Sequence, residues 1–213
     1  GLHHVTGSLL GYGTTFKDND GANDDFQGVK SSHIGFQLGY IYDRKYMVDF
    51  SSALVNSVKL PKSNKVGFSP SLALAWVVSN EDFFNKPDFL DYLKLKASTG
   101  ILKSDIPVGG FFYYDDRYTT SGSYNWYEGG KSRSGVISSW PSNPNLTFAT
   151  RKEISAGFQA LLFKSLGVEA NYFYDIYDGL VVRPSSAYPS FYSNFVPYEN
   201  FEKDSYKGIE VGI

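Results

Sequence analysis

The side chains that most often carry out chemistry are scarce in this sequence. Histidine occurs three times, at positions 3, 4 and 33, and cysteine is absent. The sequence has no Gly-x-Ser-x-Gly turn and no His-Glu-x-x-His pair, which mark many hydrolases and zinc peptidases. His3 and His4 resemble a metal-binding pair, but adjacent residues of a strand point to opposite faces. We interpret them as adventitious or structural and expect no catalytic residue, no metal site and no enzymatic activity.

An acidic segment at residues 18–25 reads Asp-Asn-Asp-Gly-Ala-Asn-Asp-Asp. Calcium binds such clusters of oxygen ligands, but an EF-hand loop has its glycine five residues after the first aspartate. Gly21 follows Asp18 by only three residues. We interpret the segment as a solvated extracellular loop, with calcium binding there as the alternative, and expect no other cofactor.

Aromatic residues crowd two segments that lack strand patterning. Aromatic rings stack on sugar rings and anchor protein contacts, and they also pack loops together. Ligand contact, partner contact and loop packing are therefore all open at these positions, and we favour packing or partner contact. The candidate contact residues are Tyr113, Tyr114, Trp126, Tyr127 and Tyr192.

Composition limits the classes of protein that these segments can serve. The net charge is -2, so no basic field attracts nucleic acid. The sequence contains 17 Tyr, 17 Phe and 21 Gly. This combination is typical of β-structure with tight turns and with amphipathic rings at a membrane boundary.

Apolar and polar residues alternate with period two in eight segments, which predicts strands. In residues 33–42, for example, Ile34, Phe36 and Leu38 fall on the face opposite to Gly35 and Gln37. Several segments reach the 9–11 residues that a tilted membrane-spanning strand needs. The predicted strands lie near 2–15, 33–42, 46–54, 67–78, 92–101, 153–163, 168–177 and 205–213.

The links between these strands alternate between short and long, as in an up-and-down barrel of the outer membrane. Residues 43–45, 79–90 and 164–167 form the short or moderate links. We treat residues 102–148 as one long loop that can contain a hairpin with arms Phe111–Tyr114 and Tyr124–Tyr127. The other long links lie near 16–31, 57–66 and 183–204.

The polar face of these strands indicates a hydrated lumen. It is rich in Gly, Ser and Ala, and it carries Asp49, Lys94, Lys96, Glu153, Glu169, Asp175 and Glu210. Such small side chains would underfill a closed barrel of eight strands, so we expect a segment of a wider barrel. A soluble sandwich or solenoid also alternates, and remains the alternative on pattern alone.

Several motifs, in order and in register, resemble the SusC/RagA-type TonB-dependent outer-membrane transporters. The strand at 92–100 resembles that family's Leu-Lys-Leu-Arg-x-Ser-x-Gly, with Lys96 in place of Arg, and a Gly-Asn pair that follows in the family is missing. Ser69 stands where the family has proline. The remaining matches are Tyr42–Asp49, Gly67–Trp76, Ser79–Phe83, Asn143–Phe148 and Lys207–Glu210.

The resemblance implies an all-β fold, with about eight consecutive strands of an antiparallel transmembrane barrel of about 22 strands. Residues 1–213 would form part of the barrel domain of a longer protein, without its plug domain. The family imports oligosaccharides or peptides across the bacterial outer membrane with a SusD-like surface lipoprotein as lid, and it draws energy from TonB–ExbB–ExbD. The five aromatic candidates would then contact substrate or lid. A soluble extracellular β-protein that binds glycan or protein is the alternative, and an outer-membrane hydrolase is a third reading that the missing catalytic residues disfavour.

Overall fold

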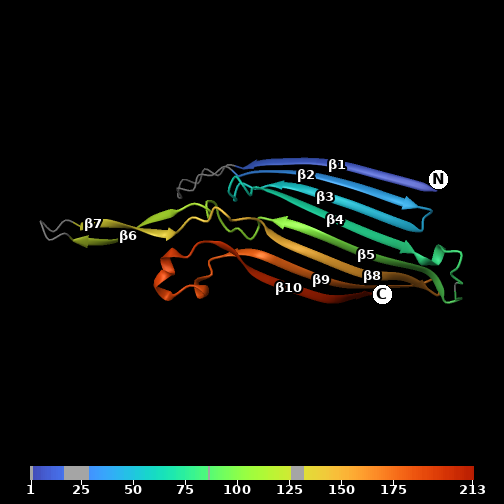
Figure 1. Cartoon of the computed structure of the whole chain (residues 1–213). Coiled ribbons are helices and arrows are strands. Elements are labelled where there is room, and N and C mark those ends of the chain that lie inside the picture. Colours follow the sequence, from blue (N-terminus) through green and yellow to red (C-terminus); the bar gives the residue numbers. More distant parts are fainter. Residues whose placement is uncertain (1, 17–28, 86, 126–131) are drawn as a thin grey trace.

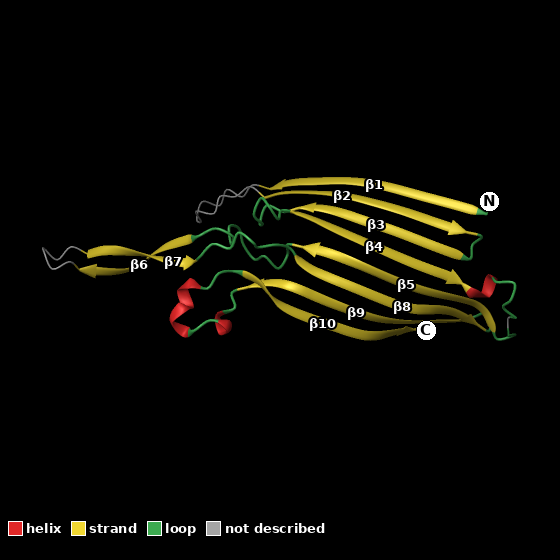
Figure 2. Ribbon diagram, viewed as in Figure 1, coloured by secondary structure: helices red, strands yellow, loops and turns green. Residues whose placement is uncertain are grey.

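The computed structural model describes residues 2–16, 29–85, 87–125 and 132–213. It consists of strands and three short 3₁₀ helices (Figures 1 and 2). The described residues include no helix long and apolar enough to cross a membrane. The strands are β1 His3–Phe16, β2 Val29–Tyr42, β3 Tyr46–Asn56, β4 Val66–Val77, β5 Leu90–Ser104, β6 Arg117–Asn125, β7 Ser132–Trp140, β8 Ala149–Leu162, β9 Leu166–Val182 and β10 Glu199–Gly212. The helices are η1 Val78–Asn80, η2 Ser185–Ala187 and η3 Ser190–Phe195.

Eight strands form one curved antiparallel sheet in the order β1-β2-β3-β4-β5-β8-β9-β10. Each strand pairs with the next in the chain, except that β5 pairs with β8. The predicted all-β, up-and-down arrangement of eight strands is therefore confirmed. Within the described residues the sheet does not close on itself, and β1 and β10 are its two edge strands.

The long link between β5 and β8 contains a separate hairpin, β6–β7, which projects away from the sheet (Figure 1). The predicted hairpin is therefore present, but its first predicted arm, Phe111–Tyr114, was wrong. Of the second predicted arm, Tyr124 and Asn125 end β6, and residues 126–127 lie outside the described residues. Phe111–Tyr114 is not a strand, because Phe112 has a φ of 60°, which interrupts extended backbone. The true arms are β6 and β7, and their serines and threonines give a weaker apolar alternation than the aromatic run does.

Register across the sheet separates two faces. Directly paired residues share a face, so Tyr40, Val48 and Leu74 lie on one side, followed by Ala97, Ala156 and Tyr172. The neighbouring row on the other side contains Gly39, Asp49, Ala73, Ser98 and Ser155. We call these the outer and inner faces. The strand predicted at 67–78 ends one residue early, at Val77. Val78 begins η1, where its carbonyl accepts the Glu81 N–H, and its side chain is buried.

Two tight hairpins lie at one end of the sheet, on the right in Figure 1. In the β2–β3 turn, Asp43 and Arg44 have φ of 49° and 54°, and the Lys45 N–H donates to the Tyr42 carbonyl at 2.9 Å. The β8–β9 turn repeats this geometry with Phe163 and Lys164 in the left-handed region. Two consecutive positive φ values define the type I′ turn, whose twist matches that of paired strands.

A belt of aromatic rings follows the outer face at this tight-turn end. Neighbouring ring centroids lie between 5.0 and 6.4 Å apart along His3, Tyr42, Tyr46, Trp76 and Phe83. Tyr, Trp and Phe rings thus gather at the strand ends here. Amphipathic rings at this position suit the boundary between lipid and water.

Glu81 contacts both the aromatic belt and the β2–β3 turn. Its Oε1 accepts the indole N–H of Trp76 at 2.9 Å, and its Oε2 lies 3.5 Å from Lys45 Nζ. Hydrogen bonds from Tyr46 and then Trp76 hold the pKa of Glu81 below its usual value. The tight-turn end is therefore fixed by contacts between residues close in sequence or in adjacent hairpins.

The opposite end contains a small core built from the long loops. Leu60, Val108 and Leu146 are almost fully buried, with Phe148 and Val181 beside them. These residues come from three different links and from β9. Side chains of one link also bond the backbone of the others, since Asn64 Nδ2 donates to the Leu146 carbonyl at 3.1 Å and Lys59 Nζ to the Val108 carbonyl at 2.8 Å.

Candidate functional site

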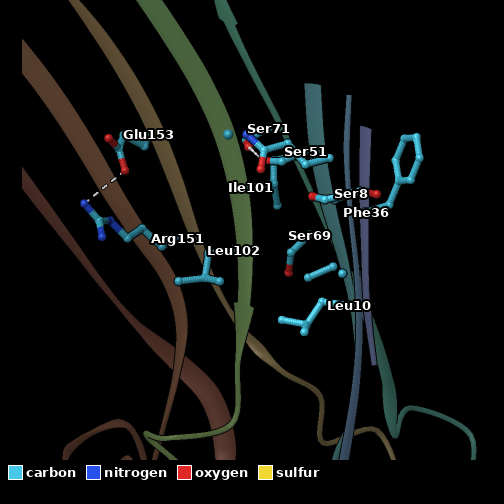
Figure 3. A pocket seen from close by; sticks show the side chains of 15 residues that line it. Ser8, Leu10, Phe36, Ser51, Ser69, Ser71, Ile101, Leu102, Arg151 and Glu153 are labelled. Atoms are coloured by element: carbon cyan, nitrogen blue, oxygen red, sulfur yellow. Dashed lines mark hydrogen bonds and ion pairs between the residues drawn. The ribbon is translucent and has the colours of Figure 1, made fainter. Parts of the chain in front are cut away.

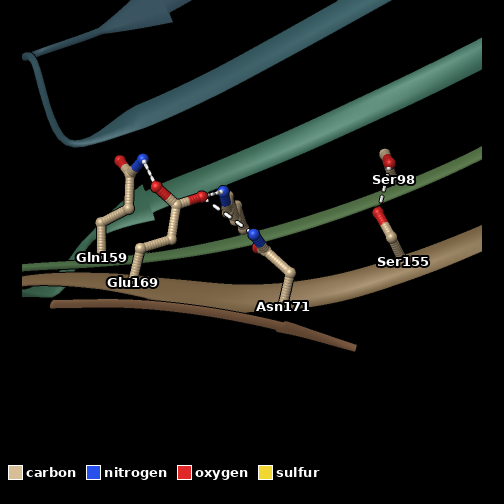
Figure 4. A network of polar contacts seen from close by, with 6 residues as sticks. Ser98, Ser155, Gln159, Glu169 and Asn171 are labelled. Carbon is tan, nitrogen blue, oxygen red and sulfur yellow. Dashed lines mark hydrogen bonds and ion pairs between the residues drawn. The ribbon is translucent and has the colours of Figure 1, made fainter. Parts of the chain in front are cut away.

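The inner face carries a polar network across β5, β8 and β9 (Figure 4). Glu169 forms an ion pair with Lys96 and accepts hydrogen bonds from Gln159 Nε2 at 3.0 Å and Asn171 Nδ2 at 2.9 Å. Ser98 and Ser155 share a hydrogen bond of 2.8 Å on the same face. The charged group of Glu169 is thus fully engaged, which fixes its side chain against the wall.

A second charged group lies further toward the loop end. Arg151 Nη2 contacts Asp175 Oδ2 at 2.9 Å and Glu153 Oε2 at 3.1 Å, and its guanidinium lies 5.6 Å from the Tyr177 ring centroid. Asp175 is only 7% exposed. Its Oδ1 and the Arg151 Nε have no hydrogen-bond partner among the described residues. A buried polar atom without a partner is costly, so this group favours a further polar contact from the lumen side.

The inner face is hollowed, and two of its larger hollows differ in their lining. One of about 640 Å³ is bordered by Asp49, Lys94, Lys96, Asp175 and Glu210, and so mixes both signs of charge. The other, of about 420 Å³, has a mixed lining (Figure 3). Serines and glycines line it together with the charged pair Arg151 and Glu153, and with the apolar residues Leu10, Phe36, Ile101 and Leu102. Figure 3 labels four of the serines that line this second hollow, Ser8, Ser51, Ser69 and Ser71. The charged hollow suits a hydrated surface that a polar solute approaches, whereas the second hollow offers both apolar and hydrogen-bonding contacts.

The predicted aromatic contact residues are separated from this face. Tyr113 stacks on Tyr198 with centroids 3.7 Å apart, and Trp140 packs edge-on against both rings. Tyr114 is partly buried against the loop core, and this burial, with Asp115 nearby, raises its pKa. Loop packing, one of the interpretations left open, is thus what the structure shows for these two tyrosines. Their contact with substrate or lid stays a prediction.

The other three candidates have different outcomes. Tyr192 lies on η3, is 45% exposed, and packs against the Phe191 ring at 4.4 Å. Its neighbour Tyr188 donates to Glu199 at 2.7 Å, which raises the Tyr188 pKa. Trp126 and Tyr127 lie outside the described residues. Tyr192 therefore remains the most accessible of the described candidates, and its partner is untested.

The structure describes only some of the residues considered for metal binding. Residues 18–25 lie outside the described residues. His3 Nδ1 lies 2.8 Å from the Tyr40 hydroxyl within the aromatic belt. In the part of the chain that the structure describes, no three His, Asp or Glu side chains gather as metal ligands do.

Sequence reasoning placed Gln159 and Asn171 on the polar face but missed Arg151, which lies just before the predicted strand at 153–163. The period-two pattern already placed Glu153, Glu169 and Asp175 on the polar face, so alternate positions were the available signal. The pairing of Lys96 with Glu169, however, joins residues 73 apart in the chain. Only the β5–β8–β9 order brings them together.

Comparison with known proteins gives a consistent picture. The TonB-dependent receptor P26 of Formosa agariphila is 31% identical over 154 residues, which are 70% of this chain and 15% of that receptor. The TonB-dependent receptor SusC of Bacteroides thetaiotaomicron is 29% identical over 126 residues, or 59% of this chain and 12% of SusC. No protein-family profile matches the chain. Both relatives are named as TonB-dependent receptors.

Solved structures agree on the fold. The RagAB peptide importer in its closed-closed state matches with a TM-score of 0.72 and 18% identity, over 99% of this chain and 25% of that one. This chain therefore spans about a quarter or less of the length of P26, of SusC and of the importer chain. The resemblance found in the sequence is confirmed, and the chain corresponds to a segment of the β-barrel of a SusC/RagA-type TonB-dependent transporter.

Proposed function

We propose that residues 1–213 form part of the barrel domain of a transporter in the bacterial outer membrane that imports oligosaccharides or peptides. The separation of an apolar outer face from a polar, hollowed inner face carries this proposal. TonB-dependent receptors are outer-membrane proteins. The segment would contribute lipid-facing wall, lumen lining and loops, and the mechanism is gated binding without covalent chemistry.

The partners belong to the same proposal. A plug domain elsewhere in the polypeptide would lie against the inner face and couple to TonB–ExbB–ExbD. A SusD-like lipoprotein would cover the loop end. The similarity to SusC and to the RagAB importer supports both partners. The mixed charges of the inner face suit either substrate class, because both glycans and peptides offer hydrogen-bonding groups.

A paired substitution tests the membrane placement in the full-length protein. Leu74 is 47% exposed on the outer face, and its neighbour Ala73 lies on the inner face opposite Asp49. We expect Leu74→Arg to destabilise the barrel by about 2–4 kcal/mol and reduce its outer-membrane level, because arginine would face hydrocarbon. Ala73→Arg, the matched control, should assemble normally in a hydrated lumen. Equal tolerance of both variants would contradict the proposed membrane-facing side.

Uptake assays test the transport itself. A strain that lacks the gene of the full-length protein should not accumulate labelled oligosaccharide or labelled peptide. The same strain complemented with the wild-type gene should accumulate one of them. One labelled substrate of each class separates the two import hypotheses. Normal uptake of both in the deletion strain would argue for the soluble binding protein instead.

A further inference from the structure

The outer face is mostly apolar, but lysines lie on it in β5, β8 and β10. Lys152 pairs in register with Ile101 on β5 and Ile176 on β9, which places it on the outer face. Lys207 pairs with Tyr174 on that face. We call the four lysines that share this region the lysine patch: Lys103, Lys152, Lys203 and Lys207.

The patch lies at the far edge of the apolar band. Lys152 precedes Leu162, the last residue of β8, by ten positions. That separation is roughly 34 Å along a strand, or about 24 Å along the membrane normal at a tilt of about 45°. The lipid-facing band of such barrels is about 25 Å tall. Lys152 therefore lies near the boundary opposite to the aromatic belt, on the loop side.

The patch keeps a net positive charge, because its four lysines share their face with one carboxylate among the described residues, that of Asp178. In the part of the chain that the structure describes, Lys152, Lys203 and Lys207 form no ion pair with a carboxylate, although Asp178 is directly opposite Lys203 in register. Lys103 Nζ donates to the Thr150 hydroxyl at 2.7 Å. Apolar side chains surround the patch, including Ile154 at 59% and Ile209 at 73% exposure.

We propose that the lysine patch binds the phosphate group of an anionic lipid in the outer leaflet. The inference rests on the proposed outer-membrane placement, in which the long loops face outward. Lysines near a membrane surface attract anionic headgroups and extend their charged ends to the interface. The adjacent isoleucines and Tyr174 would contact the acyl chains, which favours a lipid over a free anion.

The experiment compares lipid retention by the full-length protein in detergent micelles, using native mass spectrometry. Dioleoyl phosphatidic acid supplies a phosphate headgroup, and dioleoyl phosphatidylcholine is the zwitterionic reference. We expect the wild type to retain phosphatidic acid preferentially. The triple variant Lys152→Gln, Lys203→Gln, Lys207→Gln should lose affinity for it on the order of 100-fold, since each lysine contributes to the attraction.

A matched variant removes the same charge elsewhere. Lys62, Lys65 and Lys164 are exposed loop or turn residues, and changing all three to Gln should leave lipid retention unchanged. Equal retention by wild type and patch variant, both shown to be folded by heat-modifiable migration, would overturn the proposal. Displacement of phosphatidic acid by millimolar inorganic phosphate would also overturn it in favour of a free-anion site. Substrate uptake is measured in parallel, so that failure of the lipid proposal can be distinguished from failure of the proposed transport function. Import can fail while lipid retention persists.

Discussion

The two ends of the sheet are stabilised in different ways. At the tight-turn end, two type I′ turns, the aromatic belt and Glu81 join residues within neighbouring hairpins. At the loop end, Leu60, Val108 and Leu146 come from links that are far apart in sequence. Local contacts therefore define one end, and long-range packing defines the other. The loop end should consequently open more independently of the sheet.

The largest expected effect is at the loop end. Leu146 is fully buried, and Leu146→Ala should destabilise the loop core by about 2–5 kcal/mol, because it leaves a cavity. Hydrogen exchange of the full-length protein should increase in residues 57–65 and 105–116 while β2, β3 and β4 stay protected. Ile106→Ala, at an 83% exposed position of the link that contributes Val108 to this core, should have little effect. Increased exchange throughout the sheet would show that the two ends are coupled.

The same substitution at the two ends should have unequal effects. Trp76→Phe removes the indole donor to Glu81 and should cost about 1 kcal/mol. Trp140→Phe also reduces a ring, but its buried N–H has no partner among the described residues. Loss of that unpaired donor offsets lost packing, so we expect a change close to zero. Chemical denaturation of both variants in detergent measures the difference, and a larger loss for Trp140→Phe would contradict this assignment.

A smaller gain is expected from improving a turn. Phe163 and Lys164 have φ of 51° and 58°, and Asn-Gly is the favoured pair in type I′ turns. Phe163→Asn with Lys164→Gly should stabilise the barrel by about 0.5 kcal/mol, because relief of strain exceeds the added flexibility of glycine. Asn145→Gly at the loop end, where φ is not positive, should instead destabilise. Thermal melts of the full-length protein would distinguish them, and destabilisation by the turn variant would contradict the strain argument.

The smallest effect is a pH dependence confined to the tight-turn end. The folded pKa of Glu81 lies below its ordinary value because Tyr46 and Trp76 donate to it. The stability that ionised Glu81 adds is therefore complete above the ordinary pKa of glutamate. It is lost as the pH falls through the lower pKa of Glu81 in the folded protein. Hydrogen exchange at residues 78–81 should rise in that acidic window in the wild type. Glu81→Gln should show no such pH-dependent rise in this segment.

Much of the fold could be predicted from sequence because strand alternation is a local property. The face of Tyr40, Val48 and Leu74 followed directly from period two, and the register confirms it. The first arm of the hairpin within residues 102–148 was placed wrongly, because the aromatic run at 111–114 has strand-like composition but folds back onto the loop core. The candidate contacts met the same difficulty, since Tyr113 finds its stacking partner Tyr198 far along the chain.

The sequence by itself determined the strands, their two faces, the tight turns and the family resemblance, since each depends on residues close together in the chain. Only the tertiary structure decided which distant groups meet. Sheet order placed Lys96 against Glu169 and Arg151 against Asp175, and gathered the lysine patch from three strands. The physical reason is that a strand specifies its own alternation, whereas its neighbours and their register depend on the pairing of the whole sheet.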